Sequence, residues 1–267
     1  MSGFIESIGR DMREIYNSRS ILRSLVAKNL YGRYRNSLLG FAWNFITPLI
    51  LMVMYYIIFT EINTGSTIEN RWAFISTAIF LFHYLSHSIV GGTRAFIGNA
   101  GMIKKMYVPK EILVLSDAIS NMIVCVIGYV MVMAVLLIAN YPVCLITSIT
   151  MIPLLFLSFV FGIGCIFLLS SITVYIRDVQ YALGSIGIAL FIMTPMRYMA
   201  SDATGILAQL IWYNPLTYYV EWAHDILYWG EMPDISYVIA CCILSFGLLF
   251  TGYAVFRLLR RGFVKRL

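Results

Sequence analysis

Two pairs of polar side chains lie one helical turn apart within long apolar stretches. His83 and His87 are four positions apart, and so are Asp117 and Asn121. In a helix this spacing places both members of a pair on one face. Two imidazoles on one face can ligate a metal, relay a proton or complete a polar surface, but zinc needs a third ligand and the nearby sequence offers none. We favour a hydrogen-bonded polar face for the histidines, and helix packing or loop bonding over substrate contact for Asp117.

A second candidate for chemistry is a dense group of aromatic rings and carboxylates before the last apolar stretch. Its rings are Trp212, Tyr213, Tyr218, Tyr219, Trp222, Tyr228 and Trp229. Aromatic faces stack on neutral sugars, and carboxylates accept hydrogen bonds from hydroxyl groups. The alternative is a belt of aromatic residues at a membrane surface. If the group serves a ligand, we expect the path and exit of a glycan to be lined by Tyr219, Trp222, Glu221 and Asp225.

The sequence carries no recognisable catalytic machinery. No Gly-x4-Gly is followed by Lys and Ser or Thr, so the phosphate-binding loop of an ATPase is absent. No serine or cysteine has a suitably placed histidine and acid for nucleophilic catalysis. Of the five cysteines, four lie within apolar stretches and one near the end of a stretch, which favours small buried side chains over disulfides. We predict a chain that is not an enzyme and holds no cofactor or metal of its own.

Six apolar stretches set the fold class. With 60% hydrophobic and 12% charged residues and a mean hydropathy of +0.83, the 267-residue chain is not an ordinary soluble domain. Each stretch has roughly 17–29 residues, which fits a hydrocarbon core of ~30 Å at ~1.5 Å per helical residue. We predict an all-α integral membrane protein with six transmembrane helices at Leu38–Thr60, Trp72–Ser88, Ile112–Ala139, Ile146–Val174, Ala182–Met199 and Ile235–Phe256.

The basic residues orient these spans. Seventeen of the 19 Lys and Arg residues lie on one side, and only Arg71 and Arg197 lie on the other. With the acidic residues split six and seven, the sides carry 17 − 6 = +11 and 2 − 7 = −5, which sum to the net charge of +6. Cytoplasmic loops are enriched in Lys and Arg, so we expect both termini in the cytoplasm. The positive charge is a topology signal, and we expect no nucleic-acid partner.

Residues 1–37 are expected to form a cytoplasmic amphipathic region that precedes a six-span domain of residues 38–267. Apolar residues recur at helical spacing in Phe4–Tyr16 and again in Ser20–Tyr31. A helix with basic residues on its polar face, next to a span, is expected to lie at the membrane interface. This helix serves either as an anchor or as a surface for a cytoplasmic partner.

The segment 201–234 is the exception within the membrane domain. It holds two apolar runs, Gly205–Tyr213 and Leu216–Trp229, separated by Asn214 and Pro215. Neither run is long enough to cross a bilayer. We predict a pair of short re-entrant or interfacial helices on the outer side, just before the last span.

Four stretches carry a resemblance to known proteins: YGRYRNSLLGFAWNFITP at Tyr31–Pro48, NAGMIKKMYVPKEILVL at Asn99–Leu115, TVYIRDVQY at Thr173–Tyr181 and NPLTYYVEWAHDILYWG at Asn214–Gly230. In this order they resemble the membrane subunit of ABC exporters for polysaccharides, the permeases for O-antigen, capsule and teichoic acid. The resemblance covers nearly the whole chain. It implies a homodimer in the cytoplasmic (inner) membrane that works with two separate ATPase subunits, which hold the ATP and magnesium.

The resemblance implies export of a lipid-linked polysaccharide across that membrane. The alternatives are an ABC permease for a drug or small lipid, and a channel or transporter that works without ATP. A secondary transporter would show ion-pathway charges at mid-membrane or an inverted repeat, and neither is visible. An intramembrane glycolipid enzyme would need a pair of catalytic groups near the interface, and we find no such pair.

Two groups of residues are assigned to this function. We expect the lipid pyrophosphate to meet Arg33 and Arg35, and to a lesser extent Lys28, because guanidinium groups bind phosphates through two hydrogen bonds. Plain positive-inside anchoring is the alternative for these cations. The segment 98–110 resembles a coupling helix, and we expect it to dock into the ATPase through Lys104, Lys105, Met106 and Tyr107.

Overall fold

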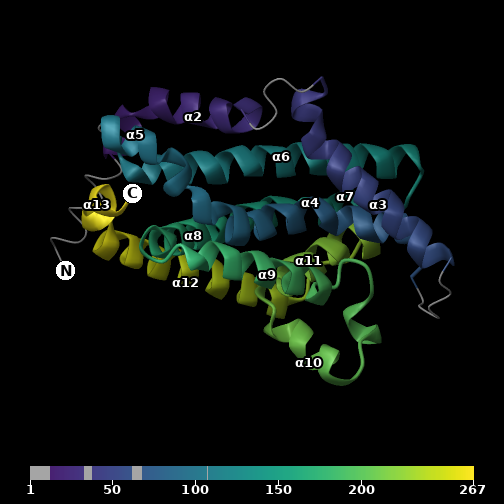
Figure 1. The fold of residues 1–267 in the computed structure, drawn as a ribbon. Coiled ribbons are helices and arrows are strands. Elements are labelled where there is room, and N and C mark those ends of the chain that lie inside the picture. Colours follow the sequence, from purple (N-terminus) through teal and green to yellow (C-terminus); the bar gives the residue numbers. More distant parts are fainter. Residues whose placement is uncertain (1–12, 33–37, 62–67, 107) are drawn as a thin grey trace.

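The fold is known from a computed structural model, which describes residues 13–32, 38–61, 68–106 and 108–267. Regular secondary structure in these residues is helical, without strands. Long helices form a bundle, and short helices close its two ends (Figure 1). The predicted all-α class is therefore confirmed.

The elements occur in the predicted order. The longer helices are α2 (Arg19–Gly32), α3 (Trp43–Glu61), α4 (Arg71–Val90), α6 (Lys110–Ile138), α8 (Met151–Tyr175), α9 (Asp178–Met193) and α12 (Ile235–Leu259). The shorter ones are α5 (Ala100–Lys105), α7 (Leu145–Ser148), α10 (Gly205–Tyr213), α11 (Pro215–His224) and α13 (Phe263–Arg266). Single turns are η1 (Gly40–Ala42), η2 (Gly91–Arg94), η3 (Ile97–Asn99), η4 (Ala200–Asp202), η5 (Asp225–Trp229) and η6 (Arg260–Gly262).

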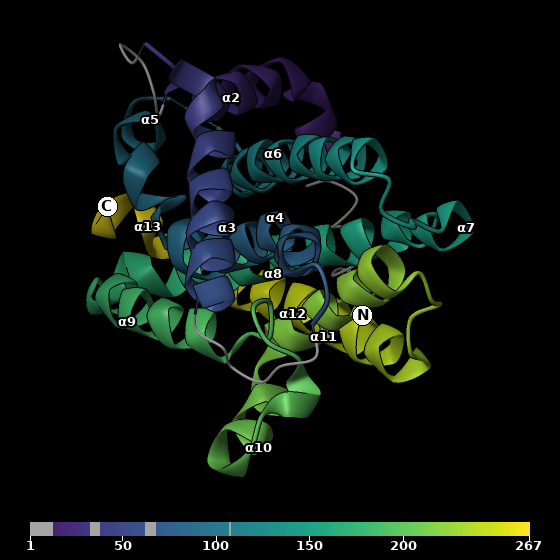
Figure 2. The same cartoon turned by 90° about the vertical axis from the view of Figure 1, so that its right-hand side faces the viewer.

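Four segments among the described residues are long and apolar enough to cross a membrane: Arg71–Arg94, Lys110–Ile138, Leu145–Tyr175 and Ile235–Gly262. They coincide with predicted spans 2, 3, 4 and 6. Apolar helices at the other two positions are shorter, so six crossings remain a prediction for α3 and α9. Figure 2 looks along the bundle and shows α3 crossing over it.

The fifth predicted span ends earlier than the sequence indicated. We expected it to reach Met199, whereas α9 stops at Met193 and Thr194 is extended. Pro195 follows, and a residue before proline avoids the helical region. The side chain of Arg197 donates hydrogen bonds to the carbonyls of Phe191 and Ile192, both at 3.1 Å, and thereby caps the helix end.

The two short helices before the last span are found where they were predicted. α10 covers the first apolar run, and α11 with the π-helical turn η5 covers the second. Asn214 separates them: its side chain accepts a hydrogen bond from the Leu216 amide at 3.0 Å and donates one to Thr194 Oγ1 at 2.8 Å. Pro215 occupies the first helical position, where a missing N–H costs nothing.

Helix α2 forms close to its predicted limits, and most of the first predicted stretch lies outside the described residues. α2 runs alongside α6 (Figure 1), and Leu25 is buried in one cluster with Ile112 and Leu113. Part of its apolar stripe therefore packs on α6, and its place at the membrane interface remains a prediction.

Two apolar clusters occupy the two ends of the bundle. The end that carries α5 and α13 is called the basic end below, and the end that carries α10 and α11 is called the acidic end. At the acidic end, α11 packs into a cluster with α4, α8 and α12. At the basic end, Phe96, Phe256 and Phe263 form the centre of the second cluster. α8 and α12 run through both clusters, and Gly164 and Gly252 leave no room for a side chain at their crossing.

Candidate functional site

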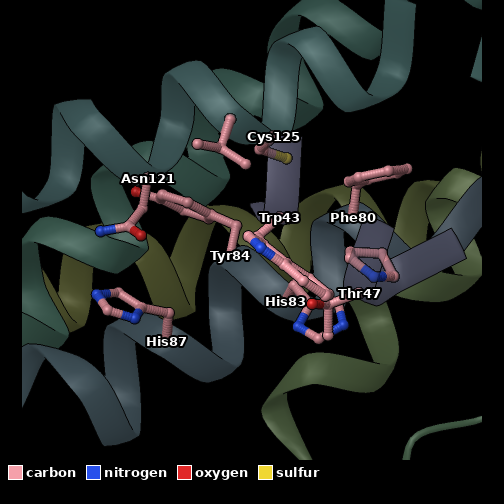
Figure 3. A pocket seen from close by; sticks show the side chains of 10 residues that line it. Trp43, Thr47, Phe80, His83, Tyr84, His87, Asn121 and Cys125 are labelled. Atoms are coloured by element: carbon pink, nitrogen blue, oxygen red, sulfur yellow. The ribbon is translucent and has the colours of Figure 1, made fainter. Parts of the chain in front are cut away.

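A cavity of about 220 Å³ lies between α3, α4 and α6. We call it the aromatic cavity, and Figure 3 shows its side chains: Trp43, Thr47, Pro48, Phe80, His83, Tyr84, His87, Asn121, Val124 and Cys125. Four of them are spaced three or four positions apart on α4, which aligns them along one face of that helix. The cavity combines flat rings with hydrogen-bonding groups.

The two histidines of this face have different surroundings. His87 Nε2 lies 3.3 Å from Asp117 Oδ2 on α6, and Asn121 donates to the Asp117 carbonyl at 2.8 Å. Asp117 thus links two helices through His87, in line with the predicted packing role, and it also lines the second cavity described below. His83 Nε2 is buried and has no hydrogen-bond partner among the described residues. Since an unsatisfied buried nitrogen costs free energy, it is available to a ligand that fills the cavity.

A second cavity, of about 780 Å³, opens at the basic end; we call it the mouth. It lies between α2, η2, α6 and α9, and its lining includes Lys28, Arg94, Asn99 and Gln180. His87 lines both the mouth and the aromatic cavity, so the two adjoin there. The structure therefore places one predicted phosphate ligand, Lys28, at a large opening. Arg33 and Arg35 lie outside the described residues.

Lys28 is exposed and already oriented in the mouth. Its Nζ donates a hydrogen bond to Asn99 Oδ1 at 2.9 Å, and Asn99 Nδ2 donates to the Ala95 carbonyl at 2.9 Å. Arg94, on η2, is exposed and lines the same opening. A flexible amine and a guanidinium at one opening are suited to a phosphate or pyrophosphate.

The aromatic residues predicted to line a glycan path are largely inside the protomer. Tyr219 is fully buried and Trp222 is 2% exposed. The Tyr219 hydroxyl is 2.7 Å from Ser245 Oγ on α12, and its ring centroid is 5.3 Å from that of Phe161. Both rings pack against neighbouring helices and offer no open face to a sugar in this protomer, because the helix face that carries them is the one turned into the bundle.

The two predicted carboxylates lie partly exposed on α11 and η5. Glu221 Oε1 is buried without a hydrogen-bond partner in the described part of the chain. Burial, followed by the charge of Asp225, raises the pKa of Glu221 to about 8. Burial likewise raises the pKa of Asp225 to about 6, although the Asp234 amide donates to it at 3.4 Å. These are acids that change charge near neutral pH.

The predicted coupling segment forms a short helix at the basic end. α5 ends at Lys105, and Met106 is extended and 60% exposed. Lys104 and Lys105 are exposed, while Tyr107 lies outside the described residues. Pro109 occupies the N-cap position of α6.

A comparison with known families decides the class of this molecule. The family described as ABC-2 type transporter matches residues 21–228, which is most of the chain. The chain belongs to the ABC-2 type transporter family. With this membership and its long apolar helices, it is a multi-pass membrane protein.

The chain is also similar to three proteins called O-antigen export system permease protein RfbA. The protein from Myxococcus xanthus is 26% identical over 259 residues, which cover 96% of this chain and 98% of that protein. Two from Klebsiella pneumoniae are 28% and 27% identical over 253 residues, which cover 92% of this chain and 94% of each. The similarity thus extends over nearly the full length of each of these proteins.

Sequence reasoning missed part of this permease's cavity. Neither Trp43 nor Thr47 was predicted to belong to a site. The spacing of Phe80, Tyr84 and the two histidines on α4 was a usable signal. The contribution of α3 was not readable, because it depends on how that helix crosses the bundle.

Proposed function

We propose that this chain is the transmembrane subunit of an ATP-driven exporter that moves a lipid-linked polysaccharide across the cytoplasmic membrane. The observation that carries the proposal is the similarity, over more than nine-tenths of the chain, to proteins called O-antigen export permeases. The proposal includes two copies of the chain, two ABC ATPase subunits that hold ATP and magnesium, and both termini in the cytoplasm.

The mouth is the proposed entry for the anionic head of the substrate. Lys28 and Arg94 line it, and Arg33 and Arg35 follow α2 in the chain. In this proposal these cations hold the lipid pyrophosphate at the cytoplasmic membrane surface by charge-assisted hydrogen bonds. This attraction does not depend on the identity of the sugar, so it serves every polysaccharide that is linked to the same carrier lipid.

The aromatic cavity next to the mouth suits the sugar that follows the pyrophosphate. The indole of Trp43 provides a face for stacking, and Thr47, His83 and Asn121 provide hydrogen-bonding atoms for hydroxyl groups. At the other end, Glu221 and Asp225 are proposed to meet the glycan as it leaves. Tyr219 and Trp222 then act indirectly, by holding α11 in place.

Energy for transport is proposed to enter at α5. Lys104, Lys105 and the exposed side chain of Met106 project from the basic end, and Tyr107 follows them. An apolar side chain ringed by cations is suited to a cleft on a partner protein. In this proposal the ATPase subunit provides that cleft.

Reconstitution tests the function directly. The permease and its ATPase are placed in proteoliposomes with the ATPase outside, and a fluorescent lipid-linked polysaccharide is added to the outer leaflet. We expect ATP to make the glycan resistant to an external glycosidase. A Lys28→Ala/Arg94→Ala variant should transport several-fold more slowly. Transport of a small lipid or drug, with no protection of the polysaccharide, would instead support the alternative ABC permease.

A further inference from the structure

The last eight residues of the chain, Arg260–Leu267, form a tail that is built into the basic end. Phe263 is fully buried. Its ring centroid is 4.8 Å from that of Phe96 and 6.0 Å from that of Phe256. Lys110 Nζ lies 5.5 Å from the same ring, within the range of a cation–π contact. The tail is therefore anchored by one aromatic side chain inserted among elements distant in sequence.

Polar contacts fix the first residue of the tail and the residue before it. Lys110 Nζ donates to the Arg260 carbonyl at 2.8 Å, and Arg260 Nη1 is 2.7 Å from Glu111 Oε1. The Glu111 side chain is only 8% exposed, so the ion pair with Arg260 offsets part of the cost of burying its charge. The Tyr175 hydroxyl donates to the Leu259 carbonyl at 3.0 Å. These contacts give the tail one fixed position against the starts and ends of three long helices.

The anchor of the tail also supports the segment that leads to α5. Phe96 is fully buried and lies between η2 and η3, directly before α5 in the chain. Phe263 packs against this ring, so the tail and the segment that precedes α5 are held by the same aromatic contact. Figure 1 shows α5, α13 and the C-terminus at the same end of the molecule. A movement of α5 must therefore move, or pull away from, the tail.

Both elements present positive charge and no negative charge. The exposed cations are Lys104 and Lys105 on α5 and Arg261, Lys265 and Arg266 on the tail. No acidic residue occurs in α5 or in residues 260–267. The two described apolar side chains of the tail, Phe263 and Leu267, pack into the cluster at this end. Among its described side chains, the tail therefore offers cations at its surface and turns its apolar groups into the bundle.

We propose that the tail and α5 form one docking surface for the ATPase subunit, with Phe263 as the residue that positions it. This inference rests on the proposed function. The partner is a protein whose acidic rim faces the tail and whose cleft receives Met106. Attraction to lipid headgroups needs no defined geometry, whereas this tail is held in one place beside α5. Charges at the rim of a protein–protein interface govern the association rate and its salt dependence more than the dissociation rate.

The first experiment tests the surface. Lys265→Glu/Arg266→Glu keeps Phe263 and all described contacts of Arg260. We expect the detergent-solubilised variant to bind the ATPase about tenfold more weakly at low salt, a rim-charge effect that shrinks as salt rises. Repeating the measurement in nanodiscs of neutral and of anionic lipid separates the partners. A loss that appears only with anionic lipid would assign the tail to headgroups and overturn the proposal.

The second experiment tests the positioning role without the ATPase. Phe263→Ala should speed hydrogen exchange of residues 96–106 by tenfold or more in the isolated permease. The matched control is Phe250→Ala on the same helix that leads to the tail, because Phe250 is 70% exposed; it should leave that exchange unchanged. Equal exchange in wild type and Phe263→Ala would refute the positioning role. If wild-type permease binds no ATPase at all, the proposed function fails while the exchange result still stands.

Discussion

Short helices close both ends of this bundle, but they are held there by different forces. At the acidic end, α11 is sunk into the interior, with Tyr219 and Trp222 covered by α4, α8 and α12. At the basic end, α13 has one buried ring, and the residues just before it are tied down by an ion pair and by hydrogen bonds to carbonyls. α11 is held mainly by apolar burial, whereas the tail combines one buried ring with partly exposed ionic contacts.

This difference in the contacts at the two ends indicates which end is suited to motion. Apolar burial gives stability that salt does not screen and that is lost only by opening the core. Partly exposed ionic contacts weaken with salt and can be broken and remade singly. In the proposed exporter, which receives its energy at the basic end, such contacts allow motion there while the opposite end serves as a stable scaffold. The predictions below test this contrast.

The orientation of the two ends is the largest expected effect, because labelling is all or none. In a variant without the five native cysteines, single cysteines at Glu69 and Asp202 should react with an impermeant thiol reagent outside intact cells. Cysteines at Lys105 and Arg261 should react only after the membrane is opened. Labelling of the cysteine at position 105 in intact cells would show that the two ends have the opposite orientation and would overturn the proposed direction of transport.

Trp222→Ala should cost about 3–5 kcal/mol of stability, as expected for deleting a buried ring. The substitution opens a cavity under α11, and the measured quantity is the midpoint of thermal unfolding in detergent. Trp229→Ala is the matched control at the same end, because Trp229 is 50% exposed; it should shift the midpoint little. Similar shifts for both variants would mean that α11 is not part of the core.

The contrast also explains what the sequence could predict. Asn214 and Pro215 locate α11 correctly because a cap and a first-turn proline act within a few residues. The apolar runs located the spans for the same local reason. The tail was not predictable in this way, since Arg260 and Glu111 are 149 positions apart. The end of α9 was missed although Pro195 was visible, because the apolar run continues past it.

The same distinction between local pattern and long-range packing holds within the site. The spacing of His83 and His87 correctly placed them on one face of a helix, and the same spacing placed Asp117 and Asn121 on one face of another. Nothing in the sequence indicated that these two faces meet, or that Trp43 completes a cavity with them. The aromatic cluster before the last span was read as a surface, but helix α11 turns Tyr219 and Trp222 inward.

Arg260→Gln should destabilise the basic end by about 1–3 kcal/mol, because it removes the guanidinium that pairs with the buried Glu111 carboxylate. Glu111→Gln removes that charge, so the double variant should recover part of the loss. The measurement is a double-mutant cycle of thermal unfolding at low and high salt. A coupling free energy near zero would show that the ion pair does not hold the tail, and the contrast with the acidic end would then fail.

Glu221→Gln should have no effect at acidic pH and an effect that grows as the pH rises. Burial raises the pKa of Glu221 in the folded permease to about 8, above its ordinary value of 4.5. Between these values the folded state binds more protons than the unfolded state, so stability falls as pH rises through this window. The glutamine variant lacks this loss: it should match wild type at pH 5 and unfold a few degrees higher at pH 8. The charge of nearby Asp225 contributes to this shift. Asp225→Asn should therefore lower the pKa of Glu221 and with it the upper limit of the pH window. Parallel curves for wild type and Glu221→Gln from pH 5 to 8 would show that this carboxyl is solvated like a surface acid and that the acidic end is more open than its packing indicates.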